Sequence, residues 1–92
     1  MKQKTIDGFS YIKVSNTRKK VMLALEGKVL MPSEISKKVR ISPPHTSRAL
    51  NDLREKDLIV CLNPDKRVGK LFVLTDFGKE VLQCVKKYIE NE

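Results

Sequence analysis

The chain has little of the chemistry that metal sites and disulfide frameworks require. Its 92 residues include one histidine and two cysteines, Cys61 and Cys84, which lie far apart and form no CxxC pair. A structural zinc site needs about four ligands drawn from such residues, so the sequence predicts no metal site. We expect both cysteines to be small buried residues, because a disulfide requires oxidising surroundings that nothing else in the sequence implies.

Long apolar runs are also absent. No stretch approaches the roughly 20 apolar residues that span a bilayer, and the basic start of the chain leads into no apolar segment typical of signal peptides. A cytoplasmic protein is therefore expected. The sequence has no second histidine, no nucleophile spaced to meet a base and no glycine-rich phosphate loop. It therefore predicts neither an enzyme nor a cofactor.

What the sequence has in excess is positive charge. Nineteen Lys and Arg residues against eleven Asp and Glu residues give a formal net charge of +8 on a chain with room for one domain, residues 1–92. Such a charge favours a polyanionic partner, either nucleic acid or an anionic membrane. Binding to a membrane surface requires a long basic amphipathic helix, and the sequence predicts none, so we expect no membrane partner.

The first part of the chain predicts an N-terminal segment and two helices. Residues 1–16 are expected to form an arm or a short strand, because aromatic and β-branched side chains gather near their end. Ser15 or Asn16 is suited to cap a helix over residues 17–26. A short helix follows over residues 32–39, where a proline stands at the first helical position.

A third helix is predicted over residues 44–56. Ser42 is a good capping residue, but Pro43 precedes a second proline, which disfavours helical geometry, so Pro44 is expected to be the first helical residue. At about 100° per residue, one helix face collects Thr46, alanine and leucines, which are typical of a core. The opposite face and its edge carry short polar groups and an arginine, namely His45, Ser47, Arg48 and Asn51.

The pattern then changes to strands. Apolar segments at 58–62 and 70–74 predict a hairpin whose basic, turn-rich tip lies within residues 63–70. Both strands are apolar on both faces, so the N-terminal segment, the last helix or a partner subunit is expected to cover the second face. The last helix occupies residues 76–92. Its apolar stripe is wide, and packing within the chain and packing against a second subunit remain alternatives.

The order of these elements predicts a function. Two helices joined by a very short turn have the spacing of a helix-turn-helix, whose second helix lies in the major groove. Helix 44–56 would then contact bases through His45, Ser47, Arg48 and Asn51. Prolines donate no N–H group, so phosphate contacts are expected partly from other elements, including the basic hairpin on the backbone or minor groove. They are assigned to Ser33, Ser42, Thr46, Lys66, Arg67 and Lys70.

Six short runs carry a resemblance to a known family. They are MPSEIS at 31–36, VRIS at 39–42, SRALNDL at 47–53, LIVCLNP at 58–64, GKLFVLT at 69–75 and GKE at 78–80. Together they resemble MarR/ArsR-like winged helix-turn-helix transcription regulators of small archaeal type. The resemblance implies an α+β fold with a three-helix core and a two-stranded β wing over residues 17–75, followed by a C-terminal helix. It also implies a homodimer formed through the C-terminal helix and the N-terminal segment.

The chain departs from the family pattern at three positions. Met31 stands where a threonine cap is usual, and Arg40 and Asp57 stand where glycine is usual. A metal-sensing cysteine pair is absent, and the sequence assigns no small-molecule effector. The leading hypothesis is a sequence-specific, double-stranded DNA-binding regulator. The alternative is a winged-helix module that binds protein partners or RNA instead of specific DNA.

Overall fold

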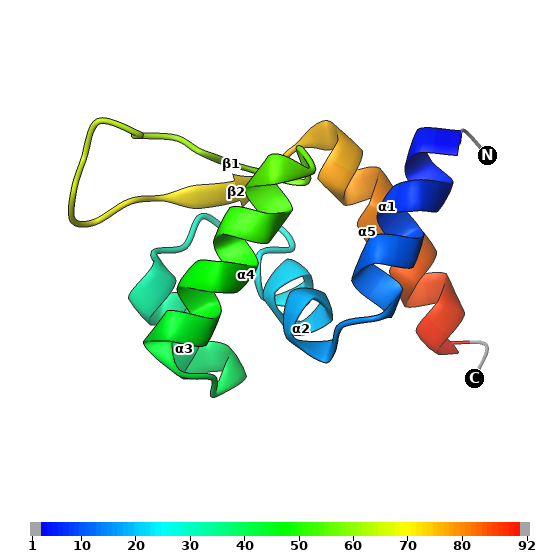
Figure 1. Ribbon diagram of the computed structural model, residues 1–92, viewed down its shortest axis with the longest axis horizontal. Coiled ribbons are helices and arrows are strands. Elements are labelled where there is room, and N and C mark those ends of the chain that lie inside the picture. The colour runs from blue at the N-terminus through cyan, green and yellow to red at the C-terminus, as the bar shows by residue number, and fades with distance from the viewer. Residues whose placement is uncertain (1–2, 91–92) are drawn as a thin grey trace.

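The computed structural model describes residues 3–90, which form five helices and a two-stranded antiparallel sheet (Figure 1). In chain order the elements are α1 Gln3–Lys13, α2 Asn16–Ala24, α3 Pro32–Val39, α4 Pro43–Glu55, β1 Ile59–Cys61, β2 Phe72–Leu74 and α5 Asp76–Glu90. The hairpin and α3 lie at one end of the molecule, and α1 and α5 lie together at the other. The prediction of an α+β winged helix-turn-helix fold is confirmed.

Within the described residues, the prediction of an arm or a short strand over residues 1–16 is wrong, and residues 1 and 2 lie outside the described part. Residues 3–13 form the helix α1, and its buried residues Thr5, Gly8 and Ile12 follow a helical spacing. This face packs on α5 at close range, because a Cβ atom added to Gly8 would lie 2.8 Å from Cγ2 of Val81. Packing against α5 overrides the strand preference of the local sequence.

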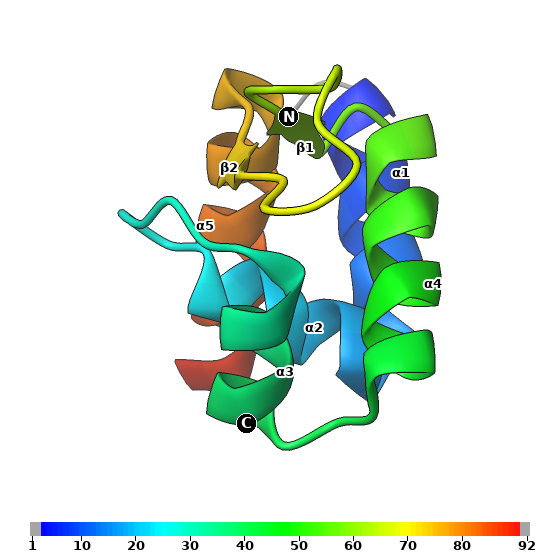
Figure 2. The ribbon, with the colours of Figure 1, turned by 90° about the vertical axis from the view of Figure 1, so that its left-hand side faces the viewer.

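The helix-turn-helix is built by short local signals (Figure 2). Pro32 begins α3, and Arg40 ends it with a left-handed backbone, φ 58° and ψ 48°. Ser42 then caps α4 by accepting a hydrogen bond from the His45 backbone N–H at 3.4 Å. The first residue of α4 is Pro43 and not Pro44 as predicted, because the fixed φ of a proline suits the first helical position even when a second proline follows.

The wing is a short antiparallel hairpin, in which Ile59 pairs with Leu74 and Cys61 with Phe72. Leu30 adds an isolated bridge to Phe72 on the other edge of β2, a pairing that the sequence did not predict. The inward side chains of both strands are buried. On the outward face Val60 is 44% exposed and Leu62 is 55% exposed, so the described part of the chain leaves this face uncovered.

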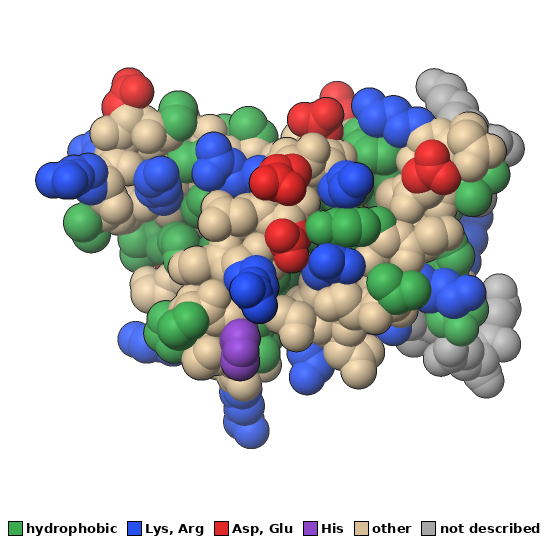
Figure 3. Space-filling model, in the orientation of Figure 1, with side chains coloured by type: hydrophobic (Ala, Val, Ile, Leu, Met, Phe, Trp, Pro, Cys, Tyr) green, Lys and Arg blue, Asp and Glu red, His purple; other side chains and the backbone are tan. Residues whose placement is uncertain are grey.

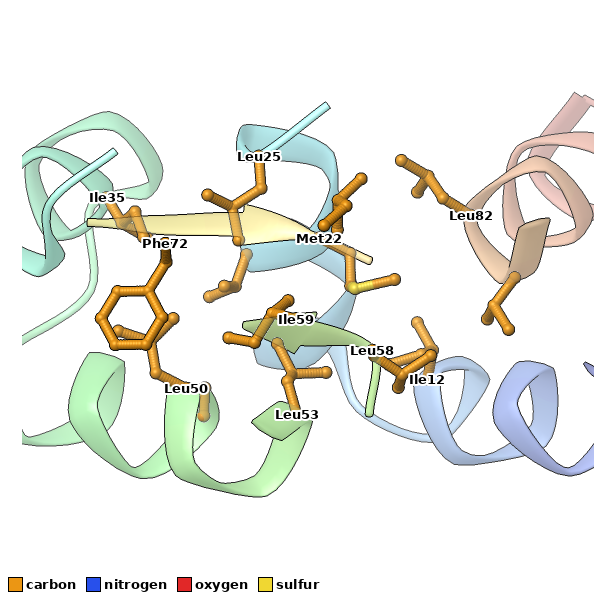
Figure 4. Packing of buried hydrophobic residues seen from close by; sticks show 14 of the residues in the cluster. Ile12, Met22, Leu25, Ile35, Leu50, Leu53, Leu58, Ile59, Phe72 and Leu82 are labelled. Carbon is orange, nitrogen blue, oxygen red and sulfur yellow. The ribbon is translucent and has the colours of Figure 1, made fainter. Parts of the chain in front are cut away.

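One hydrophobic core joins the helices to the wing (Figure 4). It includes Met22 of α2, Leu25 directly after that helix and Leu53 of α4, and all three are almost fully buried. The apolar stripe of α5 belongs to the same core, since Val81, Leu82 and Val85 are at most 1% exposed within a single chain. Packing within the chain therefore accounts for these three residues. No helix in residues 3–90 is long and apolar enough to cross a membrane.

Candidate nucleic-acid interface

The exposed side of α4 borders two hollows, one toward the wing and one toward α2. The larger, which we call the wing groove, has a volume of about 650 Å³. Its walls come from the start of α3, the exposed face of α4 and the second half of the wing loop. The lining residues are Met31, Pro32, Ser33, Ser47, Leu50, Asn51, Arg54, Arg67, Val68, Gly69, Lys70 and Phe72.

The wing groove combines an apolar floor with a basic rim. Leu50 and Phe72 are buried beneath it, whereas Arg54 and Arg67 are exposed at its sides. Within residues 3–90, no salt bridge joins Arg54, Arg67 or Lys70 to a carboxylate. Figure 3 shows Lys and Arg side chains along the wing and over α4 on the face turned to the viewer. The groove therefore presents positive charges that form no salt bridge within residues 3–90.

The smaller hollow, which we call the helix cleft, has a volume of about 190 Å³ and lies between α4 and the start of α2. His45 and Arg48 line it from α4, opposite Ser15, Thr17 and Arg18. The four predicted base contacts are thus divided, since Ser47 and Asn51 line the wing groove instead. His45, Ser47, Arg48 and Asn51 are all exposed. A duplex lying along α4 would meet both pairs, one on each side of the helix axis.

Arg18 fixes the wall of the helix cleft. Its guanidinium lies over the Tyr11 ring at 3.8 Å from the centroid and donates a hydrogen bond to the Tyr11 carbonyl oxygen at 3.2 Å. It also forms an ion pair with Asp52 of α4, with Nη2 and Oδ2 3.5 Å apart. Partial burial raises the pKa of the Tyr11 phenol, against the opposing effect of Arg18. Arg18 therefore links α1 and α4 while Asp52 offsets its charge.

A buried hydroxyl pair sets α4 against α3. Ser36 Oγ and Thr46 Oγ1 lie 2.7 Å apart, and Thr46 Oγ1 donates to the Ser42 carbonyl oxygen at 3.0 Å. Because Thr46 has a single hydroxyl proton, Ser36 must be the donor in the bond between them. Thr46 is completely buried, and its backbone N–H is bonded to Ser42 O. The prediction that Thr46 contacts a phosphate is therefore wrong.

The other predicted phosphate contacts are accessible to different degrees. Ser33 lies exposed at the start of α3, and Ser42 is exposed although its hydroxyl accepts the capping hydrogen bond. Lys66 is exposed on the wing but does not line the groove, whereas Arg67 and Lys70 do. The structure thus gathers Ser33, Arg67 and Lys70 in the wing groove.

Arg54 is a groove residue that sequence reasoning missed. It lines the same groove as Ser47 and Asn51, from the last turn of α4. A signal was present, because residues 47, 51 and 54 are spaced by four and three and share one helix face. The sequence interpretation confined the DNA-reading surface to the first two turns of the helix and so stopped short of Arg54.

The described residues contain no group of three or more His, Cys, Asp or Glu side chains placed to hold a metal ion. Cys61 is buried as expected and donates its thiol proton to Asn63 Oδ1 at 3.5 Å. Cys84 is only partly buried. Neither cysteine takes part in the wing groove or the helix cleft.

A family model described as "Bacterial regulatory protein, arsR family" matches residues 15–60. The match contains α2, α3, α4 and the start of the wing, and therefore both walls of the helix cleft and the whole helix-turn-helix. It covers half of the chain. A search of curated proteins found no match.

Solved structures share the fold at low sequence identity. A mutant of Lactococcus lactis ZitR has a TM-score of 0.74 and 23% identity; the match covers 84% of this chain and 53% of that chain. TubR from Bacillus thuringiensis serovar israelensis, solved bound to 24 bp of tubC, has a TM-score of 0.77, 18% identity and coverage of 91% and 94%. A mutant of MepR from S. aureus has a TM-score of 0.77, 20% identity and coverage of 97% and 68%. The chain thus spans about half the length of ZitR.

Proposed function

Since the chain belongs to the arsR family of bacterial regulatory proteins, which are transcription regulators and not enzymes, we propose that it regulates transcription by binding specific sites in double-stranded DNA. The helix α4, Pro43–Glu55, would lie in the major groove, and the wing loop would lie on the backbone or minor groove beside it. TubR, which has the same fold, is solved in complex with DNA, and this supports the proposal.

The observation that carries the proposal is the basic wing groove alongside an exposed polar helix. A major groove is about 12 Å wide and admits one α-helix, so the phosphate backbones run along both sides of the inserted helix. The wing groove supplies Arg54, Arg67 and Lys70 on one such side. Their positive charge, which no carboxylate within residues 3–90 offsets in a salt bridge, suits a phosphate chain.

We assign the contacts by reach and chemistry. Arg48 and Asn51 have the donors and acceptors for bidentate contacts to guanine and adenine, and His45 and Ser47 provide single hydrogen bonds to base edges. The phosphate contacts are assigned to groups at the edges of the interface. These are Ser33, Ser42, Lys66, Arg67 and Lys70, with Arg54 added from the groove.

The protein is proposed to act as a homodimer through α5 and the N-terminal segment. In this chain α1 already packs on α5, and the buried residues Val81, Leu82 and Val85 face the chain's own core. The dimer would therefore use the remaining surface of these two helices. Sedimentation equilibrium tests the dimer directly, and a palindromic binding site with half-sites about one helical turn apart would support it.

Selection of bound sites from random duplexes tests the function. We expect a defined motif to be enriched, and Arg48→Ala to reduce the preference for that motif over scrambled DNA by roughly tenfold or more, as removal of a bidentate base contact does. The double variant Lys66→Ala/Arg67→Ala should weaken binding to both duplexes by a similar factor. Lys28→Ala, which removes an exposed lysine in the segment between α2 and α3, serves as the control for reduced charge alone.

Three outcomes would contradict parts of this proposal. If no duplex is bound better than bulk DNA, a winged-helix module for protein or RNA is the better description. If Arg48→Ala leaves the site preference unchanged, α4 does not read the sequence through Arg48. If Lys28→Ala weakens binding as much as the wing variant does, the wing has no specific role in contacting DNA.

A further inference from the structure

Asn63, in the segment that follows β1, closes the wing loop at its base. Its amide Nδ2 donates a hydrogen bond to the Gly69 carbonyl oxygen at 3.1 Å. Its Oδ1 accepts one from the Leu71 backbone N–H at 2.8 Å and a weaker one from the Cys61 thiol at 3.5 Å. One side chain thus joins the two ends of the loop that carries Lys66, Arg67 and Lys70.

Few other bonds hold this loop. Backbone pairing of the hairpin continues through Leu62 N–H to Leu71 O at 2.8 Å, and within the loop the Lys66 N–H bonds to Asn63 O at 3.1 Å. Residues 64–68 are all exposed, and Gly69 has a positive φ of 75°. A loop of exposed residues with few internal bonds samples many conformations unless its ends are tied. Asn63 is half-buried and supplies that tie.

We propose that Asn63 is a positioning residue for DNA binding, which holds the wing loop in the conformation that presents Arg67 and Lys70 along the wing groove and exposes Lys66 beside it. The inference rests on the proposed function, because it concerns how that function is achieved. It assigns to Asn63 no contact with DNA. Holding the loop in its bound shape before binding raises affinity because less conformational freedom is lost on association.

The chemistry of the position requires an amide. The side chain must donate to a carbonyl oxygen and accept from a backbone N–H at once, and a carboxamide has both groups on one short arm. Alanine makes neither bond. Aspartate keeps the acceptor for Leu71 but replaces the donor with an oxygen facing the Gly69 carbonyl, and it adds negative charge near the phosphates. Asn63→Ala is therefore the cleaner test.

The test is a double-mutant cycle on duplex affinity. The first comparison is between the Asn63→Ala variant and the unaltered protein. The second is between the triple variant Lys66→Ala/Arg67→Ala/Lys70→Ala, whose wing has no cations, and the same triple variant with Asn63→Ala added. We expect Asn63→Ala to weaken binding roughly three- to tenfold in the intact wing and to have little further effect in the neutralised wing. The slope of log K against log salt should become shallower by about 0.9 for each phosphate that the displaced loop no longer neutralises.

Val29→Ala, which shortens an exposed side chain between α2 and α3, is the control and should leave affinity unchanged. An equal reduction in affinity by Asn63→Ala in both wings would overturn the proposal, because it would show that Asn63 acts on the fold as a whole. Unchanged affinity and salt slope in the intact wing would overturn it too.

Amide hydrogen exchange separates this inference from the proposed function. If the unaltered protein binds no duplex, the proposed function fails, yet the tie formed by Asn63 can still be measured in the free protein. We expect Asn63→Ala to speed exchange at the Leu71 amide at least tenfold, while amides in α2 keep their protection. Unchanged exchange at Leu71 would show that the loop is held without Asn63, and would overturn the inference by itself.

Discussion

Within residues 3–90, two residues other than glycine hold the backbone in the left-handed conformation that side chains disfavour. Arg40 at the end of α3 has φ 58°, and Asp57 after α4 has φ 59°. For most L-residues this conformation costs about 1–2 kcal/mol, whereas aspartate tolerates it better. These are two of the positions where glycine is usual in the family that the sequence resembles. Arg40 and Asp57 thus adopt the left-handed backbone conformation that glycine favours, although neither is glycine.

Arg40→Gly is expected to stabilise the fold by about 1 kcal/mol, because it relieves the disfavoured backbone conformation at an exposed residue. Urea unfolding measures the change. Lys37→Gly, in the interior of the same helix, is the matched control and should destabilise by about 1 kcal/mol. A destabilised Arg40→Gly variant would mean that the arginine side chain stabilises the turn by more than its backbone strain costs.

The Ser36 and Thr46 hydroxyls form a polar contact buried between the two helices of the motif. Thr46→Val leaves the Ser36 hydroxyl buried without an acceptor, which costs about 1–3 kcal/mol, whereas after Ser36→Ala the Thr46 hydroxyl keeps its bond to the Ser42 carbonyl oxygen. We therefore expect Thr46→Val to destabilise by that order and Ser36→Ala by less. The double variant should cost clearly less than the sum of the two, as urea unfolding of the full cycle can measure. Additive effects would show that the two hydroxyls do not depend on each other.

At the level of elements, the junction between the wing and α5 is tightly constrained. Thr75 accepts a hydrogen bond from Gly78 N–H at 2.9 Å and donates its hydroxyl proton to Asp57 O at 2.6 Å. Its own N–H bonds to Leu58 O at 3.1 Å. Gly78 is buried so closely that an added Cβ would collide with the Leu58 carbonyl oxygen. The start of α5 is therefore fixed to the segment that joins α4 to the wing.

Gly78→Ala is expected to destabilise the protein by about 1–3 kcal/mol, since a backbone oxygen cannot turn aside as a flexible side chain can. This destabilisation should appear although alanine favours helix more than glycine does. The control is Lys79→Ala, whose side chain is exposed and makes only a long ion pair to Asp76 at 3.9 Å, and which should change stability by less than about 0.5 kcal/mol. Urea unfolding measures the stability of the two variants. Equal stability would show that a side chain at position 78 does not collide with the Leu58 carbonyl oxygen.

The elements also show what sequence can and cannot predict. Helices α2, α3 and α4 were predicted within a few residues, because their caps and apolar spacing are local features. The helix α1 was not, since its strand-like residues adopt a helix in contact with α5. The bridge at Leu30 was not predicted, because a single paired residue is too short to show the alternation of apolar and polar residues that marks a strand. In the site, local spacing placed Ser47 and Asn51 on an exposed face but could not show that His45 and Arg48 border a different hollow.

Over the whole molecule, Arg18 joins three helices that are separate in the sequence. It belongs to α2, contacts Tyr11 of α1 through its ring and carbonyl, and pairs with Asp52 of α4. The ring contact, the carbonyl bond and the ion pair together suit a planar guanidinium whose donors lie on separate nitrogens, a geometry that the single ammonium of lysine lacks. The position of α4 relative to the terminal helices thus depends partly on one side chain.

Arg18→Ala is expected to destabilise by about 1–2 kcal/mol, because it removes a partly buried ion pair, a ring contact and a hydrogen bond. Arg18→Lys should recover less than half of this, and Lys20→Ala, which alters an exposed neighbour, should change little. Urea unfolding of the three variants gives the comparison. Full recovery by lysine would show that charge alone matters at this position.

The separation of α1 and α5 from the wing along the 37 Å axis has a practical consequence. A biosensor chip that captures the protein through a tag beside α1 or α5 would leave α4 and the wing directed toward the injected solution. A tag inserted in the wing loop would instead press the basic face against the chip. Immobilisation through the helical end should therefore preserve duplex capture, and immobilisation through the wing should abolish it.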